Sequence, residues 1–186
     1  RRFGNEAILL GQIGIEVGPC AAACAFCAFG EGHTAFAATK MAEDEVLRRA
    51  RDFTRDGDLN ALFLMTTHEF DTDRLLHIVR AVRAAIPPQV QIVVNIGDFD
   101  REFADTLAAA GVNGAYHVLR LREGTDTRLT PQERLRTVDA IKAAGLDWYY
   151  CCEPIGPEHT AEEIVEQIFV GVEGGCFQHA AMRRVF

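Results

Sequence analysis

Long apolar runs are missing from this 186-residue sequence. No stretch approaches the roughly 20 consecutive apolar residues that a membrane-spanning helix needs, and the first residues lack a charged-then-apolar signal pattern. Basic residues are in deficit: 19 Lys and Arg stand against 27 Asp and Glu, the net charge is −8, and the basic side chains are scattered along the chain. We therefore expect no membrane and no nucleic-acid partner, and a soluble cytoplasmic protein.

Low-complexity stretches and linkers are also missing. With 48% apolar and 25% charged residues, the chain has the composition of one globular domain with a sizeable core. We predict a single domain over residues 1–186. Because the sequence starts at Arg1 without a Met, and because Gly174-Gly175-Cys176 has the pattern of the start of another strand, we expect this domain to be truncated at both ends.

Short apolar runs alternate with longer amphipathic ones from residue 11 onward, which is a βα pattern. The predicted strands are Ile13–Val17, Ala61–Thr66, Val90–Ile96, Ala115–Leu121 and Leu146–Glu153. The predicted helices are Glu43–Asp56, Asp71–Ala85, Arg101–Ala110, Pro131–Ala144 and Ala161–Glu173. Thr130, Pro131 and Glu133 form a helix-start signal, and Gly111 and Gly145 end helices. Continuous apolar strands followed by helices favour a parallel sheet, either open and doubly wound or part of a barrel.

Three cysteines stand close together after the first predicted strand. Cys20, Cys24 and Cys27 have the spacing Cys-x3-Cys-x2-Cys, with Phe26 before the last. This spacing is poor for disulfides, but three thiolates from one loop can hold three irons of a cubane and leave the fourth iron open. The alternatives are a zinc site with His33 as fourth ligand, or three core cysteines. Structural zinc sites usually arrive as two separated ligand pairs, which disfavours zinc.

This motif resembles the signature of the radical S-adenosylmethionine (SAM) superfamily. From about residue 11 to 175 the chain is similar to the biotin synthase branch, with biotin synthase, the hydrogenase-cofactor maturases and lipoyl-synthase-like enzymes. The resemblance implies an α/β fold: a TIM-type (βα) barrel, complete or partial, with parallel strands and the cluster loop after the first strand. It also implies that Cys20, Cys24 and Cys27 hold a [4Fe-4S] cluster that cleaves SAM reductively to a 5′-deoxyadenosyl radical.

The SAM contacts that the resemblance implies are Phe26, Thr66, Thr67, Asn95, Arg122, Glu123, Arg134 and Ile155. Thr66 and Thr67 stand where the family has a Gly-Gly-Glu-like segment for the SAM amino group, although the glycines are missing here. Arg134 follows a helix start similar to the one whose arginine contacts the SAM carboxylate, and Ile155 begins an Ile-Gly-Pro-Glu segment that packs on adenine. The alternatives are a core anchor for Phe26, a turn cap for Asn95 and an exposed helical arginine for Arg134.

Two arginines close the fourth predicted strand. The segment from Arg120 to Glu123 resembles the strand end of the hydrogenase maturases, and strand alternation would put Arg120 and Arg122 on one inward face. Buried arginines require an anionic partner, which Glu123, the SAM carboxylate or an acidic substrate could provide. We predict that the residues lining the substrate pocket are Arg120, Tyr150, Cys151 and Glu153.

The sequence departs from biotin synthase itself, which holds a second cluster with cysteines on its second, third and fifth strands. The second and third predicted strands here contain no cysteine, so we expect no [2Fe-2S] site, although Cys151, Cys152 and Cys176 remain candidate ligands. Sulfur insertion, methyl or carbon transfer and rearrangement all stay open. The expected partners are a small-molecule or protein-bound cofactor precursor and an electron donor such as flavodoxin or ferredoxin. The alternative function is a non-catalytic iron–sulfur or zinc-binding α/β domain.

Overall fold

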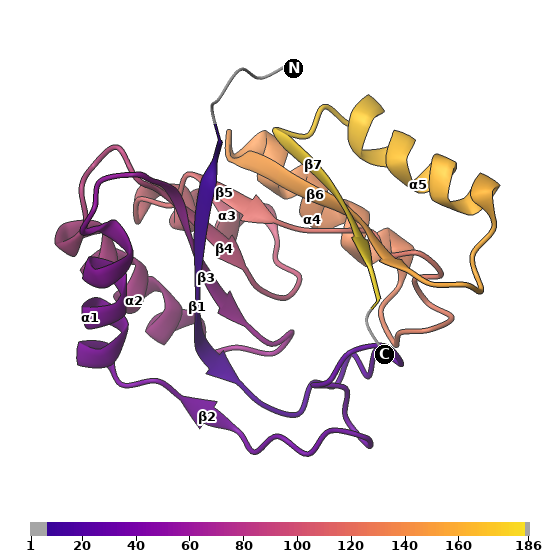
Figure 1. Ribbon diagram of the computed structural model, residues 1–186, viewed down its shortest axis with the longest axis horizontal. Coiled ribbons are helices and arrows are strands. Elements are labelled where there is room, and N and C mark those ends of the chain that lie inside the picture. Colours follow the sequence, from indigo (N-terminus) through magenta and orange to yellow (C-terminus); the bar gives the residue numbers. More distant parts are fainter. Residues whose placement is uncertain (1–6, 185–186) are drawn as a thin grey trace.

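One sheet organises the fold (Figure 1). The computed structural model describes residues 7–184, and within that range seven strands form one sheet in the order β2-β1-β3-β4-β5-β6-β7. The strands are β1 Leu9–Val17, β2 Thr39–Lys40, β3 Leu59–Thr66, β4 Gln91–Asn95, β5 Gly114–Tyr116, β6 Asp147–Ile155 and β7 Gln178–Arg183. The helices are α1 Glu43–Thr54, α2 Thr72–Ala85, α3 Arg101–Ala109, α4 Pro131–Ala143 and α5 Ala161–Glu173.

The sheet is a partial (βα) barrel, as predicted. β1 and β3 to β7 run parallel, and only the two-residue β2 pairs antiparallel with β1. The helices lie outside the curved sheet, with α1 beside β1 and α5 beside β6 (Figure 1). Within the described residues the sheet does not close between β1 and β7. The carboxyl ends of six parallel strands therefore meet at one edge, where barrel enzymes place their active sites.

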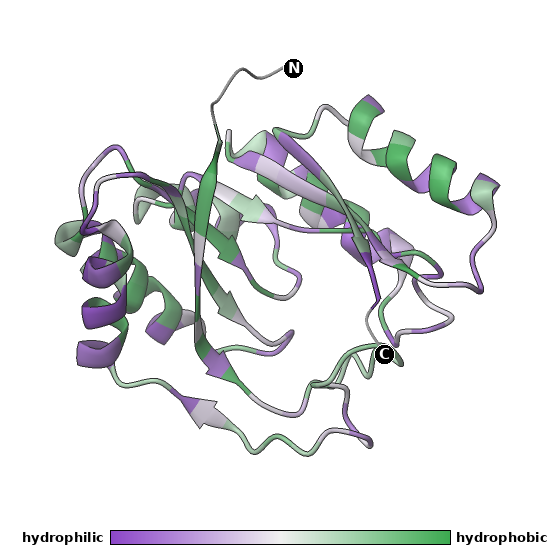
Figure 2. Ribbon diagram, viewed as in Figure 1, coloured by the Kyte–Doolittle hydropathy of each residue, from purple (hydrophilic) through white to green (hydrophobic). Residues whose placement is uncertain are grey.

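Alternation along the strands divides the core into two layers. Leu62 and Leu64 of β3 belong to the large cluster between sheet and helices, whereas Phe63 belongs to a small cluster on the inner face with Tyr149. α1 turns its hydrophilic residues away from the sheet (Figure 2). Fully burying one such aliphatic side chain contributes about 1.5–3 kcal/mol, so the outer layer stabilises the scaffold that holds the strand ends.

The helix boundaries follow their local signals. Thr130 and Glu133 form the predicted capping box, in which each side chain accepts a hydrogen bond from the other residue's backbone N–H. Gly111 and Gly145 follow α3 and α4 with φ of 100° and 72°, a left-handed conformation that favours glycine. None of the helices in the described part of the chain combines the length and the apolar character that a membrane crossing requires.

The fourth predicted strand is wrong beyond Tyr116, and β2 was not predicted. After β5 the backbone carbonyls accept hydrogen bonds from side chains and not from a neighbouring strand. The donors to His117, Val118 and Leu119 are Trp148, Arg134 and Tyr150, respectively. The segment from residue 117 to residue 130 is therefore an irregular loop, which we call the β5–α4 loop. Arg122 lies in it with φ of 56°, so strand alternation does not apply and the predicted shared face of Arg120 and Arg122 is wrong.

Candidate cluster and cofactor site

A cavity of about 460 Å³ opens at the carboxyl edge of the sheet. The residues of its lining that the sequence singled out are Cys20, Cys24, Cys27, Thr66, Thr67, Asn95, Arg120, Arg134 and Glu153. They come from the cysteine loop, the ends of β3, β4 and β6, the β5–α4 loop and α4. Residues up to 133 positions apart in the sequence thus share one cavity, because parallel strands end at the same edge.

Tight turns orient the cysteines. The carbonyls of Cys20, Cys24 and Cys27 each accept a hydrogen bond from the backbone N–H three residues later, at 3.0 Å. One turn therefore begins at each cysteine. Cys20 and Cys24 are buried, Cys27 is partly exposed, and Leu129 packs against this cluster.

The donor set fits a cubane cluster. The lining of the cavity within residues 7–184 contains three thiols, and no three His, Cys, Asp or Glu side chains there are arranged around a single ion position. In a cubane cluster each thiolate binds a different iron, so the three thiols do not have to surround a single ion. His33 places Nε2 2.8 Å from the Cys27 carbonyl oxygen, which does not support the zinc alternative. Burial raises the pKa of the Cys24 thiol to about 11, and the nearby Arg120 charge opposes that shift.

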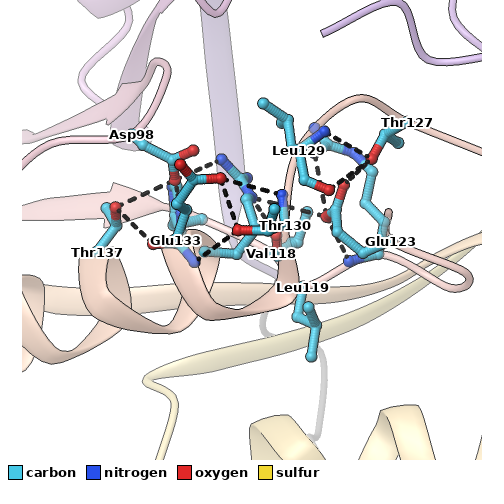
Figure 3. A network of polar contacts seen from close by, with 12 residues as sticks. Asp98, Val118, Leu119, Glu123, Thr127, Leu129, Thr130, Glu133 and Thr137 are labelled. Carbon is cyan, nitrogen blue, oxygen red and sulfur yellow. Dashed lines mark hydrogen bonds and ion pairs between the residues drawn. The ribbon is translucent and has the colours of Figure 1, made fainter. Parts of the chain in front are cut away.

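Arg134 lies buried at the cavity wall with only 3% of its side chain exposed, so the alternative of an exposed helical arginine is wrong. Its Nε donates to the Val118 carbonyl at 3.0 Å and its Nη1 donates to Asp98 at 2.9 Å (Figure 3). The Nε atom is also 3.7 Å from the Glu123 carboxylate. These contacts fix the plane of the guanidinium group.

Arg120 has the anionic partners that the sequence required. Its guanidinium lies 3.7 Å from both Glu123 and Glu153. Glu153 also accepts a hydrogen bond of 2.7 Å from the Tyr116 hydroxyl, and burial raises the pKa of that phenol. Because neither carboxylate is within hydrogen-bond distance of the guanidinium, Arg120 can present its donors to the cavity.

Several predicted residues lie elsewhere. Phe26 packs against the cysteine cluster, and neither Phe26 nor Ile155 belongs to the cavity lining within the described range. Arg122 points outward, where it donates to Glu163 at 3.3 Å and to the Glu158 carbonyl. Glu123 is buried behind Arg120 and does not line the cavity in the described residues.

Two predicted pocket residues, Cys151 and Tyr150, line a second cavity of about 220 Å³. Tyr150 nevertheless belongs to the large cluster between sheet and helices, and its hydroxyl is 3.2 Å from the carbonyls of Leu119 and of Gln167 in α5. Cys152 points to the same helix, with its sulfur 3.8 Å from the Ile164 carbonyl, whereas strand alternation turns Cys151 to the other face. The two adjacent cysteines therefore do not face a common site.

Sequence reasoning missed Asp98, which follows β4. Its carboxylate accepts hydrogen bonds from Thr137 (Figure 3) and from Arg134. It also lies 3.0 Å from the His117 imidazole. Burial works to raise the pKa of Asp98, but the His117 contact and the Arg134 charge outweigh it and hold that pKa well below its usual range. Its position two residues before the N-cap of α3 resembles an ordinary helix start, so only the three-dimensional contacts reveal it.

The chain is similar in sequence and in fold to several known proteins. Biotin synthase of Carboxydothermus hydrogenoformans is 28% identical over 178 residues, which covers 89% of this chain and 54% of that protein. The fold is similar to that of methylornithine synthase (PylB), with a TM-score of 0.85, 14% identity and coverage of 98% and 55%. It is also similar to that of the FeFe-hydrogenase maturase HydG from Carboxydothermus hydrogenoformans, with a TM-score of 0.73, 15% identity and coverage of 98% and 46%. The chain spans about half the length of each.

The family itself follows from a match to a family profile. The profile of the radical SAM superfamily matches residues 18–169, which include the cysteine loop, β3 to β6 and most of α5. Members of this family use a [4Fe-4S] cluster and SAM, which agrees with a cavity lined by three thiols, one fewer than the irons of such a cluster. With the three-cysteine cavity at the carboxyl ends of parallel strands, this match shows that the chain belongs to the radical SAM superfamily.

Proposed function

We propose that this chain binds a [4Fe-4S] cluster through Cys20, Cys24 and Cys27 and cleaves SAM reductively. The observation that carries the proposal is the meeting of three thiols with two arginines, the buried Arg134 and the partly buried Arg120, around one cavity. When bound, the cluster and SAM supply a 5′-deoxyadenosyl radical, which abstracts a hydrogen atom from a small organic substrate. The protein's part is to bind, to orient and to exclude water.

The chain's own polar groups suit a zwitterionic ligand. Arg134 is held in one orientation by Asp98 and the Val118 carbonyl, so it offers a fixed positive charge to the SAM carboxylate. Thr66, Thr67 and Asn95 line the cavity at the strand ends and offer oxygen atoms to an ammonium or a ribose. Arg120 and Glu153 lie on the same lining and are proposed to contact the substrate.

The substrate is proposed to be a small-molecule or protein-bound precursor in cofactor biosynthesis. β3 and β4 carry no cysteine, so sulfur donation from a second cluster on those strands is not supported; maturase-like or lipoyl-synthase-like chemistry is favoured over that of ordinary biotin synthase. A one-electron donor such as flavodoxin or ferredoxin, and a cytoplasmic setting, belong to the same proposal.

Anaerobic reconstitution tests the proposal. Protein loaded with iron and sulfide and reduced with dithionite should convert SAM to 5′-deoxyadenosine, detected by mass spectrometry. The Cys24→Ala variant should lose both the cluster and SAM cleavage. The Cys152→Ala variant, which removes a buried thiol that faces α5, should keep both. Cleavage retained in Cys24→Ala would refute the assignment, and a loaded cluster without SAM cleavage would favour the non-catalytic iron–sulfur domain.

A further inference from the structure

The β5–α4 loop reaches across to the cysteine loop. The backbone N–H of Ala25 donates to the Asp126 carbonyl at 2.9 Å, and the N–H of Arg128 donates to the Ala22 carbonyl at 2.8 Å. Leu129 adds a buried side chain against Cys20 and Cys24. Residues 126–129 of one loop thus hold the cluster loop in place by two hydrogen bonds and one apolar contact.

The same loop carries the charged residues of the cavity. Glu123 has 1% of its side chain exposed, and its carboxylate accepts a hydrogen bond from the Arg120 backbone N–H at 3.0 Å. It lies 3.7 Å from the guanidinium groups of both Arg120 and Arg134. A carboxylate buried to this extent depends on its hydrogen-bond donors.

One hydroxyl joins these two halves of the loop. Thr127 is buried, and its Oγ1 donates to the Glu123 carboxylate at 2.6 Å (Figure 3). The same oxygen accepts from the backbone N–H of Gly124 at 3.2 Å and of Leu129 at 3.3 Å. A hydroxyl has one proton and two lone pairs, so every hydrogen-bonding position of Thr127 is used.

We infer that Thr127 is a positioning residue that couples the arginine-facing carboxylate to the cluster loop. The hydroxyl fixes Glu123 and residues 126–129 in one arrangement. Ligand binding at Arg120 and Arg134 therefore depends on the geometry of the cysteine loop, and the geometry of the cysteine loop depends on ligand binding at these arginines. This inference rests on the proposed function, because it requires a cluster and SAM in the cavity.

Removal of the hydroxyl gives a defined result. In Thr127→Val the Glu123 carboxylate loses a donor and two backbone N–H groups lose their acceptor, at nearly unchanged side-chain shape. We expect near-wild-type iron content and about tenfold weaker SAM binding, which corresponds to the loss of one charge-assisted hydrogen bond. The change that SAM causes in the electron paramagnetic resonance spectrum of the reduced cluster should shrink in parallel.

Matched variants separate coupling from a general structural effect. Thr127→Ser keeps the hydroxyl and should restore both SAM affinity and the spectral response. Thr106→Val removes a hydroxyl that donates to the Glu102 carbonyl at an exposed position of α3, and it should behave like wild type. If Thr127→Val does not fold, Thr127→Ala is measured in the same way.

The outcomes also separate this inference from the proposed function. Wild-type protein that loads a cluster but does not cleave SAM would refute the proposed function. Wild-type cleavage together with an unchanged SAM affinity or an unchanged spectral response in Thr127→Val would overturn only the coupling by Thr127.

Discussion

The buried Arg134 and the partly buried Asp98 form an ion pair of 2.9 Å between the end of β4 and the first turns of α4. The same carboxylate accepts from the Thr137 hydroxyl at 3.1 Å and lies 3.0 Å from the His117 imidazole. One acidic side chain thus holds groups from α4 and from the β5–α4 loop. The direction of the Arg134 guanidinium at the cavity wall depends on this carboxylate.

Asp98→Asn should therefore cost both stability and SAM affinity. The variant keeps the shape but leaves Arg134 buried with Glu123, at 3.7 Å, as its nearest remaining counter-charge. We expect the free energy of unfolding to fall by about 1–3 kcal/mol, because the buried Arg134 guanidinium loses a charged acceptor that is itself partly exposed. Urea unfolding measures this. Asp105→Asn, which breaks an exposed pair with Arg101, should change it by less than about 1 kcal/mol, and equal effects would contradict the role of Asp98.

His117 predicts how stability depends on pH. Burial lowers the pKa of this fully buried imidazole to about 3; the Arg134 charge adds to the shift, Asp98 opposes it and Arg120 also lowers it. In the unfolded chain the pKa of histidine is about 6.5, so below that pH the unfolded state binds one more proton. Stability should fall by up to about 1.4 kcal/mol per pH unit from about pH 6.5 downward towards pH 3.

Urea unfolding at pH 7, 6 and 5 tests this dependence. His117→Phe keeps an aromatic ring beside Phe99 and removes the titrating group, so its stability should decline less between pH 6.5 and pH 5. His77→Gln is the matched control, because His77 is 66% exposed beside Glu43. An identical pH slope in wild type and His117→Phe would show that another group carries the effect. The depressed pKa of Asp98 acts in a different window, since its contribution is lost only below about pH 4.

Gly97 lets two strand ends approach each other. A Cβ added at Gly97 would lie 1.9 Å from the His68 carbonyl oxygen, which is rigid backbone. Gly97→Ala must therefore push the segment after β3 away from β4 and displace Thr66 and Thr67 from the cavity. We expect about a tenfold or greater loss of SAM affinity in equilibrium dialysis, since a displaced contact costs more than about 1.4 kcal/mol.

The control for Gly97 is Gly14, another glycine that precedes the cavity edge. A Cβ at Gly14 would meet Val17 and Met65 side chains at 3.4 and 3.6 Å, which is ordinary van der Waals contact. Gly14→Ala should keep wild-type SAM affinity. Unchanged affinity in Gly97→Ala would mean that the segment after β3 does not contribute to the site.

Much of the fold could be predicted because its signals are local. The apolar run at Leu62–Leu64 indicates a strand buried on both faces, and the capping box at Thr130 and Glu133 marks the start of α4 within the sequence itself. The β5–α4 loop could not be predicted in this way. Val118 and Leu119 look like strand residues, but their carbonyls bond Arg134 and Tyr150, which are 16 and 31 positions away.

In the candidate site, too, the residues of a local motif could be predicted and those placed by distant contacts could not. The cysteine spacing is contiguous, so the sequence alone identifies Cys20, Cys24 and Cys27 as one donor set. Asp98 and Thr127 act through contacts with residues on other elements or within an irregular loop, and neither lies in a motif. Arg120 and Arg122 show most clearly where prediction from the sequence fails. The left-handed backbone at Arg122 places its side chain on the outer surface and not beside Arg120.

Glu69, which follows β3, is a further anchor of the cysteine loop, in addition to the β5–α4 loop. The backbone N–H of Ala21 donates to its carboxylate at 3.2 Å, so the segment after β3 anchors the residue next to Cys20. Glu69→Ala removes the acceptor, and we expect an iron chelator to remove the cluster several times faster, as measured by the loss of the cluster's visible absorbance. Glu69→Gln keeps an acceptor oxygen and should retain iron like wild type. Glu31→Ala removes an exposed partner of Arg128 on the same loop and should have no effect. Slow, wild-type-like iron loss in Glu69→Ala together with weaker SAM binding would instead make Glu69 a ligand of SAM, because the carboxylate would then act on the bound nucleotide and not on the loop.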